Sequence, residues 1–167
     1  LVDDKGRIVN GDLILGIIAT KWKDKNILKN NTVVGTNMSN SGLEKYLNKN
    51  NINFIRADVG DRNIIKEMKK NDFILGGEPS GHIILNNMSS SGDGLLASLE
   101  VLYTLKESKK KLSSFSNLFK PFPQIIQSFP INKNNSAEKI LKKLKPEILK
   151  LNNSFKSDNR LILRKSG

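Results

Sequence analysis

The pattern that most constrains this chain is a repeated order of strand, turn and helix in its first two thirds. Short apolar runs typical of buried strands occur at residues 32–35, 52–59 and 82–85, and each precedes a turn and an apolar-striped helix. Strands that alternate with helices pair in parallel, because each helix carries the chain back across the sheet. We therefore expect a mostly parallel α/β layer that forms one compact domain ending near Phe119.

The remaining residues predict a second, smaller unit of α+β type. Lys120–Pro123 contains two prolines and is typical of a linker. We expect a strand over 124–131, a basic amphipathic helix from Ser136 that Pro146 kinks or breaks, and a last strand over 160–163. The apolar stripe of this helix comprises Ile140, Leu141, Leu144, Ile148 and Leu151.

Polar side chains stand where strands give way to helices. Asp12 and Asp61 are expected to cap the helices that follow them, and Ser41 with Glu44 forms a capping-box pattern. Trp22, near the end of the first helix, is expected in the core or at an interface.

Two turns follow predicted strands and therefore lie at the carboxyl edge of the sheet, where parallel α/β sheets bind ligands. One is Met38–Asn40, and the other is Gly60–Arg62. An Asp-Arg pair can reach a ligand, with Asp on an amine or hydroxyl and Arg on a phosphate. The spacing alone does not separate helix capping from ligand contact at either turn.

The segment Gly76–His82 carries a carboxylate, a hydroxyl and the chain's one imidazole at every second position. On an extended backbone, Glu78, Ser80 and His82 would point to the same side. Glycines and a proline around them allow a tight turn close to a ligand. Such a set of donors and acceptors suits a polyol. A loop whose polar side chains bond to its own backbone is equally compatible with this sequence.

Charge raises a second class of function. The net charge is +12, and residues 106–167 hold 15 basic and 4 acidic side chains against 13 and 12 in residues 1–105. A basic half could attract phosphates, so a phosphate- or nucleic-acid-binding module is an alternative. However, 23 of the 28 cations are Lys and no aromatic residues interleave with them to stack bases, which favours solvated helix faces. We therefore expect no nucleic-acid partner.

Six short motifs in register resemble the α-D-phosphohexomutases, above all the bacterial members that act on glucosamine phosphate. They are Gly11-Asp12, Met38-Ser39-Asn40 with Gly42-Leu43-Glu44, Val59-Gly60-Asp61-Arg62, the Gly76–His82 segment, Gly92-Asp93-Gly94 and Arg164-Lys165-Ser166-Gly167. The resemblance implies an isomerase that shifts a phosphoryl group between the 6- and 1-oxygens of a hexosamine phosphate through a phosphoserine. A family member acting on mannose or glucose phosphate is the alternative within this class.

The resemblance also implies the site residues. Glu78 and Ser80 would hold sugar hydroxyls, and His82 would orient the ring or help to move a proton. The implied substrate-binding set is Ser39, Asn40, Gly60, Asp61, Arg62, Glu78, Ser80 and His82, and the implied phosphate-binding set is Arg164, Ser166 and Gly167. Family members use Mg²⁺, but their phosphoserine and metal loops lie upstream of the position of Leu1. We therefore expect no metal at Asp3 and Asp4, which are read as a turn.

In family terms, residues 1–119 would be a three-layer α/β/α domain, with 1–11 as the tail of the preceding metal-loop domain. Residues 120–167 would be an incomplete phosphate-binding domain with an apolar face lacking its cover. We expect a fragment cut at both ends, inactive alone, with a hexosamine phosphate as its partner. The chain has no cysteine and no apolar run near the roughly 20 residues of a membrane span, so a cytoplasmic protein without a membrane partner is expected.

Overall fold

The computed structural model describes residues 1–132, 136–155 and 159–165, and the chain divides into two compact units. Unit 1 comprises Leu1–Phe122 and unit 2 comprises Pro123–Gly167. Each unit is described by itself.

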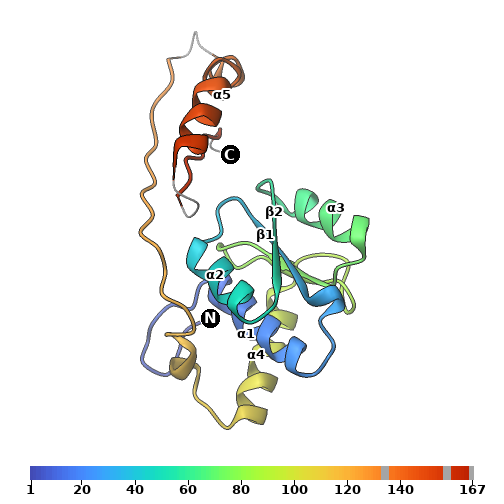
Figure 1. The fold of residues 1–167 in the computed structure, drawn as a ribbon. Coiled ribbons are helices and arrows are strands. Elements are labelled where there is room, and N and C mark those ends of the chain that lie inside the picture. Colours follow the sequence, from blue (N-terminus) through green and yellow to red (C-terminus); the bar gives the residue numbers. More distant parts are fainter. Residues whose placement is uncertain (133–135, 156–158, 166–167) are drawn as a thin grey trace. The chain divides into compact units, whose positions relative to one another are not determined.

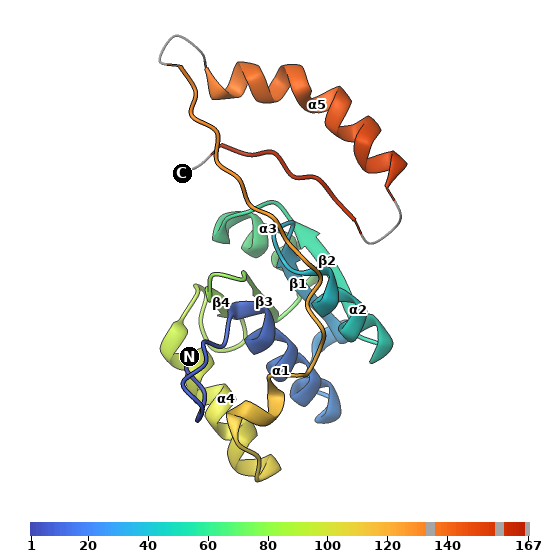
Figure 2. The ribbon, with the colours of Figure 1, turned by 90° about the vertical axis from the view of Figure 1, so that its left-hand side faces the viewer.

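Unit 1 is built on a four-stranded sheet with the order β2-β1-β3-β4 (Figures 1 and 2). The strands are β1 (Thr32–Thr36), β2 (Asn53–Ala57), β3 (Leu75–Gly77) and β4 (Ile83–Leu85). Strand β1 pairs in parallel with β2 and with β3, whereas β4 returns antiparallel to β3. The mostly parallel layer predicted from the strand and helix order is therefore confirmed.

Helices cover both faces of this sheet, so the predicted three-layer α/β/α arrangement is also confirmed (Figure 1). On one face, α1 (Gly11–Asp24), α2 (Ser41–Lys49) and α4 (Gly94–Ser108) share the larger core. On the other face, α3 (Asp61–Asn71) packs against the sheet through Ile64 and Met68. Two 3-10 turns, η1 (Lys29–Asn31) and η2 (Leu112–Phe115), complete the unit.

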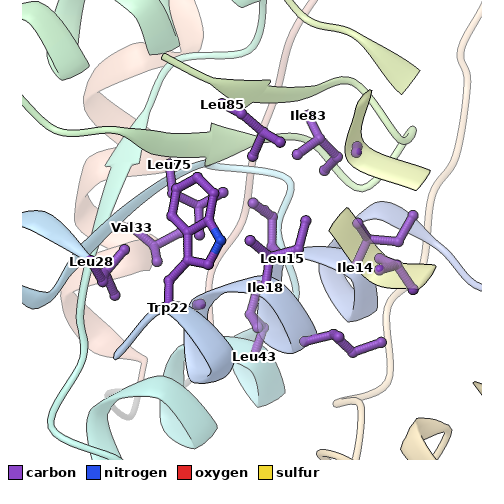
Figure 3. Close-up of a cluster of buried hydrophobic side chains, with 14 of the residues drawn as sticks. Ile14, Leu15, Ile18, Trp22, Leu28, Val33, Leu43, Leu75, Ile83 and Leu85 are labelled. Atoms are coloured by element: carbon purple, nitrogen blue, oxygen red, sulfur yellow. The ribbon is translucent and has the colours of Figure 1, made fainter. Parts of the chain in front are cut away.

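The larger core gathers around Trp22, which is 1% exposed and lies among Leu28, Val33 and Leu75 (Figure 3). Its indole N–H donates to Glu100 Oε1 on α4 at 2.6 Å. The buried ring stabilises the core, and the hydrogen bond avoids the cost of burying an unpaired indole N–H. Trp22 thus lies in the core, as predicted.

Helix α1, which carries Trp22, is also joined to α4 at the surface, by a cluster around Glu107 of α4. Its carboxylate accepts from Lys21 of α1, from Lys25 just after α1 and from the hydroxyl of Tyr103. These contacts, with the hydrogen bond from Lys21 first, lower the pKa of Glu107 from 4.5 to about 2.

The N-terminal residues form a turn at Asp4–Gly6, bracketed by an antiparallel bridge between Val2 and Ile8, as predicted. The carboxylate of Asp3 accepts from the backbone N–H groups of Lys5 and Arg7. These carboxylate bonds close the turn locally, because they hold its two ends together.

The first cap differs from the prediction. Asn10, not Asp12, caps α1, because its side chain accepts from Leu13 N at 3.0 Å. Asp12 lies in the first turn, and its buried Oδ2 accepts from the backbone N–H of Asn40 at 2.8 Å. A carboxylate two residues further along reaches the neighbouring helix rather than its own.

The second cap also shifts by one residue. Asn40, not Ser41, caps α2 by accepting from Gly42 N at 2.8 Å. The carboxylate of Glu44 accepts from the guanidinium of Arg56 on β2. A charged donor makes such a bond stronger than a neutral one would.

Unit 2 contains α5 (Ala137–Ser154), in which no described residue is buried. The strands predicted at 124–131 and 160–163 are wrong, because neither described segment has a hydrogen-bonded strand partner. Of the two outcomes predicted at Pro146, the break is wrong, because α5 continues through this residue, and the kink stays a prediction. Within the described residues, no helix combines the length and apolarity that crossing a membrane requires.

Candidate functional site

Three turns meet at one edge of the sheet in unit 1. Because β1, β2 and β3 run in the same direction, their carboxyl ends bring residues 37–40, 58–60 and 78–82 to that edge. The amino end of α1 lies at the same edge, where Gly11 N–H donates to Pro79 O at 3.0 Å. This is the part of a parallel sheet that usually binds ligands.

Hydrogen bonds join these turns in sequence. Asn37 Nδ2 of the first turn donates to Asp58 Oδ1 of the second at 3.1 Å. The backbone N–H of Gly60 in the second turn donates to Glu78 Oε1 of the third at 2.7 Å. Glu78 therefore holds two loops together through one of its carboxylate oxygens.

The remaining two bonds pass through α1 and close the ring. Gly11 N–H donates to the carbonyl of Pro79 in the third turn, and the carboxylate of Asp12 accepts from Asn40 N–H in the first. We call the three turns and the start of α1 the loop ring. Each of its members contacts two others, so a shift in one turn disturbs the rest.

The backbone at Gly76–His82 is not extended throughout, as the spacing argument assumed. It turns between β3 and β4, with Gly81 at φ +102° and Gly81 N–H donating to Glu78 O at 3.0 Å. The turn brings two of the three predicted side chains together, since Ser80 Oγ donates to Glu78 Oε2 at 3.4 Å. His82 is exposed and lies beside Gly92.

The second turn begins α3 without a side-chain cap. Its cap residue is Gly60, at φ +114°, so the predicted cap Asp61 is instead the first residue of the helix. Asp61 is half-buried and Arg62 is exposed. Arg62 lines a shallow basic depression on α3 with Lys66 and Lys69. The structure thus brings Gly60 next to Glu78 and directs Arg62 along the helix.

The predicted contacts Ser39 and Asn40 lie in the interior of the first turn. Ser39 is 0% exposed and its Oγ accepts from Thr36 N–H. Asn40 is 6% exposed, and its side-chain oxygen accepts from the N–H groups of Gly42 and Phe122. Contact between either side chain and a ligand would require this turn to open.

A cavity of about 330 Å³ opens beside the third turn. Its size is at the lower end of the range for small-molecule sites. Ser80 is the predicted site residue that lines it, whereas Glu78 and His82 do not. The lining residues are Leu1, Ile8, Val9, Asn10, Gly11, Ile14, Pro79, Ser80, Gly81, Gly94, Ala97 and Ser98.

Sequence reasoning missed two residues of this edge. Asn10 and Ser98 line the cavity from α1 and α4. A cap signal was present at Asn10, but no spacing rule connects it to Ser98, 88 positions later.

The predicted phosphate-binding residues belong to unit 2. Arg164 is exposed and its guanidinium donates to the carbonyl of Lys165 at 3.3 Å. Ser166 and Gly167 lie outside the described residues.

The described part of the chain holds no group of three or more His, Cys, Asp or Glu side chains that could bind a metal ion. Mg²⁺ prefers carboxylate oxygens in an octahedral arrangement, so the residues described here do not fit that ion.

Comparison with known proteins identifies relatives along the whole chain. Residues 10–122 match the family described as Phosphoglucomutase/phosphomannomutase, alpha/beta/alpha domain III. The phosphoglucosamine mutase of Zymomonas mobilis is 43% identical over 167 residues, and that of Pelagibacter ubique is 45% identical over 175 residues. Each alignment covers 100% of this chain and 37% of the relative, so the chain spans little more than a third of their length.

Solved structures share the fold. A putative phosphomannomutase from Thermus thermophilus superposes with a TM-score of 0.59 at 24% identity, covering 65% of this chain and 25% of that one. Aspergillus fumigatus N-acetylphosphoglucosamine mutase, in complex with GlcNAc-6P and magnesium, gives 0.59 at 15% identity, covering 74% and 30%.

Proposed function

This chain belongs to the phosphoglucomutase/phosphomannomutase family, and we propose that it supplies the sugar-recognition part of a phosphoglucosamine mutase. Such an enzyme is an isomerase that interconverts glucosamine 6-phosphate and glucosamine 1-phosphate through a phosphoserine. Full coverage of this chain by two proteins named phosphoglucosamine mutase supports the choice of glucosamine over mannose or glucose.

The observation that carries the proposal is the position of Glu78 in the loop ring. One carboxylate oxygen is held by Gly60 N–H at 2.7 Å, and the other faces the hydroxyl of Ser80. A carboxylate fixed at one oxygen presents the other in a defined direction, where it can accept from a sugar hydroxyl or amine. Ser80 adds a group that can both donate and accept, and exposed His82 orients the sugar or moves a proton.

The neighbouring groups extend this site. Asp61 accepts from a hydroxyl or the amine, and Arg62 provides a guanidinium for the substrate phosphate. Ser39 and Asn40 support the site from the interior of the first turn. Arg164, with Ser166 and Gly167, binds the phosphate group from unit 2, since cations and backbone N–H groups suit a dianion.

The substrate is a hexosamine phosphate and the protein acts in the cytoplasm, with no nucleic-acid or membrane partner. Mg²⁺ accompanies the sugar phosphate in the Aspergillus structure, but the described residues of this chain offer it no carboxylate cluster. No step proposed for these residues therefore passes through a metal.

The test replaces the matching segment of the Zymomonas mutase with these 167 residues and measures conversion of glucosamine 6-phosphate. Glu78→Ala should lower turnover about 10- to 100-fold, because a hydrogen bond to a charged group contributes about 1.5–3 kcal/mol. Glu67→Ala is the matched control, since that carboxylate pairs with Lys70 on the surface of α3. Wild-type turnover in the Glu78→Ala chimera would refute the assigned role.

Binding to the 167-residue chain provides a second readout if the chimera does not fold. Glucosamine 6-phosphate should shift the amide NMR signals of residues 58–62 and 78–82, and glucose and mannose 6-phosphates should bind less tightly. Unchanged signals at both turns would contradict sugar recognition by the loop ring. Tighter binding of mannose or glucose phosphate would instead assign the chain to a mutase for that sugar.

A further inference from the structure

The last residues of unit 1 pack across α1 and α2. We call Ser116–Phe122 the exit segment, because unit 2 begins at Pro123. Figure 2 shows this segment passing α1 and α2 before the chain leaves unit 1. Leu118 approaches Gly16 of α1 so closely that a Cβ there would lie 2.8 Å from its Cδ2. The ring of Phe119 lies 6.4 Å from that of Tyr46 on α2.

The final residue of the exit segment is held by the side chain of Asn40. Asn40 Nδ2 donates to Phe122 O at 2.9 Å, and Phe122 N–H donates to Asn40 Oδ1 at 2.8 Å. A side-chain amide thus pairs with a backbone residue through both of its polar atoms. Because proline has no N–H, Phe122 has the one amide proton available between Lys120 and Gln124.

The glycine two residues after Asn40 makes this close approach possible. A Cβ at Gly42 would lie 2.3 Å from the carbonyl oxygen of Lys120. The backbone of the exit segment therefore occupies the space that any other side chain at position 42 would need. Gly42 N–H also donates to Asn40 Oδ1, so one oxygen serves the helix cap and the exit segment together.

Asn40 is itself held in place by a residue of α1. It is 6% exposed, and its backbone N–H donates to the buried carboxylate of Asp12. Because Asn40 belongs to the first turn, the point at which the chain leaves unit 1 is bonded directly to the loop ring. Buried hydrogen-bonded groups of this kind hold one arrangement, because leaving any of them unpaired is costly.

We propose that Asn40 is the anchor of the exit segment, a positioning residue that fixes Phe122 as the point from which the chain extends into unit 2. Phe122, the last residue of unit 1, is the residue to which the side chain of Asn40 is hydrogen-bonded. Without the anchor, the exit segment could detach, and the linker to unit 2 would lengthen by up to about seven residues. A longer linker lowers the effective concentration of unit 2 at the surface of unit 1. The consequence for delivering Arg164 to a sugar phosphate rests on the proposed function, whereas the anchor itself does not.

The test is amide hydrogen exchange of the 167-residue chain, followed residue by residue by NMR. The Phe122 amide should be protected in the wild-type protein. Asn40→Ser keeps an oxygen that can cap α2 but cannot reach Phe122. It should speed exchange at Phe122 at least about tenfold while exchange at Gly42 changes less than about threefold. An unprotected Phe122 amide in the wild type, or unchanged exchange in Asn40→Ser, would overturn the proposal.

A pair of glycine variants provides a second, independent measurement. Gly42→Ala keeps Asn40 but forces the exit segment away, so exchange at Phe122 should again accelerate about tenfold or more. Gly94→Ala is the matched control, because a Cβ at the start of α4 meets nothing within 4 Å. Equal exchange at Phe122 in the two variants would count against the anchor. Neither experiment uses a substrate, so failure here leaves the sugar-recognition proposal standing, and the reverse also holds.

Discussion

The contact between the start of α1 and the turn after β3 makes Gly11 the most sensitive position of the loop ring. A Cβ at Gly11 would lie 1.9 Å from Glu78 O and 2.8 Å from Gly81 N. Both are backbone atoms, which cannot rotate away as a side chain can. In Gly11→Ala the turn must therefore retreat by about 1.5 Å to restore ordinary contact.

The expected loss of stability follows from two effects. Overpacking at a close contact costs about 1–3 kcal/mol. Loss of the bond from Gly11 N–H to Pro79 O adds about 1 kcal/mol. Alanine is the better helix former by up to about 1 kcal/mol, which offsets part of this loss. We therefore expect Gly11→Ala to lower the free energy of unfolding by about 1–3 kcal/mol.

Urea unfolding measures this change directly, with Gly94→Ala as the control. Both variants place alanine at the first position of a helix, but the space at Gly94 is open. Gly94→Ala should be neutral or slightly stabilising. Because Glu78 moves with the turn, Gly11→Ala should also weaken binding of glucosamine 6-phosphate. If the two variants unfold at the same urea concentration, the close contact does not hold the turn and the reasoning is refuted.

Two further changes test the ring and the surface cluster. Gly60→Ala should lower the free energy of unfolding by about 1–3 kcal/mol, because φ at this position is +114°. It should also weaken sugar-phosphate binding, because the Gly60 N–H holds Glu78. Unchanged stability in urea together with unchanged binding would argue against this prediction. The folded pKa of Glu107, about 2, lies below its ordinary 4.5, so its stabilisation is present above about pH 4.5 and is lost as the pH falls toward 2. Glu107→Gln should therefore lose stability less steeply between pH 4.5 and 2 in an acid titration followed by circular dichroism, and superimposed curves would contradict the assignment.

The regular elements of unit 1 were predictable because their signals are local. Val33 and Val34 belong to an apolar run that is buried on both faces, and Ile64 and Met68 recur at helical spacing. Such periodicities follow from backbone geometry, so they survive in any fold that buries one face of each element. The edge at which residues 38–40 and 60–62 lie followed in turn from the parallel order of the strands.

The cap residues and the elements of unit 2 could not be predicted in the same way. Asn10 and Asp12 both suit a helix start, and the choice depended on Asn40 of another helix being within reach of Asp12. Residues 124–131 have the composition of a strand, but a strand exists only where a neighbour completes its hydrogen bonds. Each of these outcomes depends on a partner that local sequence does not specify.

The sequence alone determined the strands β1, β2 and β4 of unit 1, the mostly parallel order of its sheet and the two polar turns that follow β1 and β2. Tertiary structure alone decided how those turns are joined: Glu78 binds Gly60, and Asn40 grips Phe122, 82 positions away. The physical reason is that periodicity is set by bonds between near neighbours, whereas these hydrogen bonds require two distant groups to be brought together by packing of the whole core.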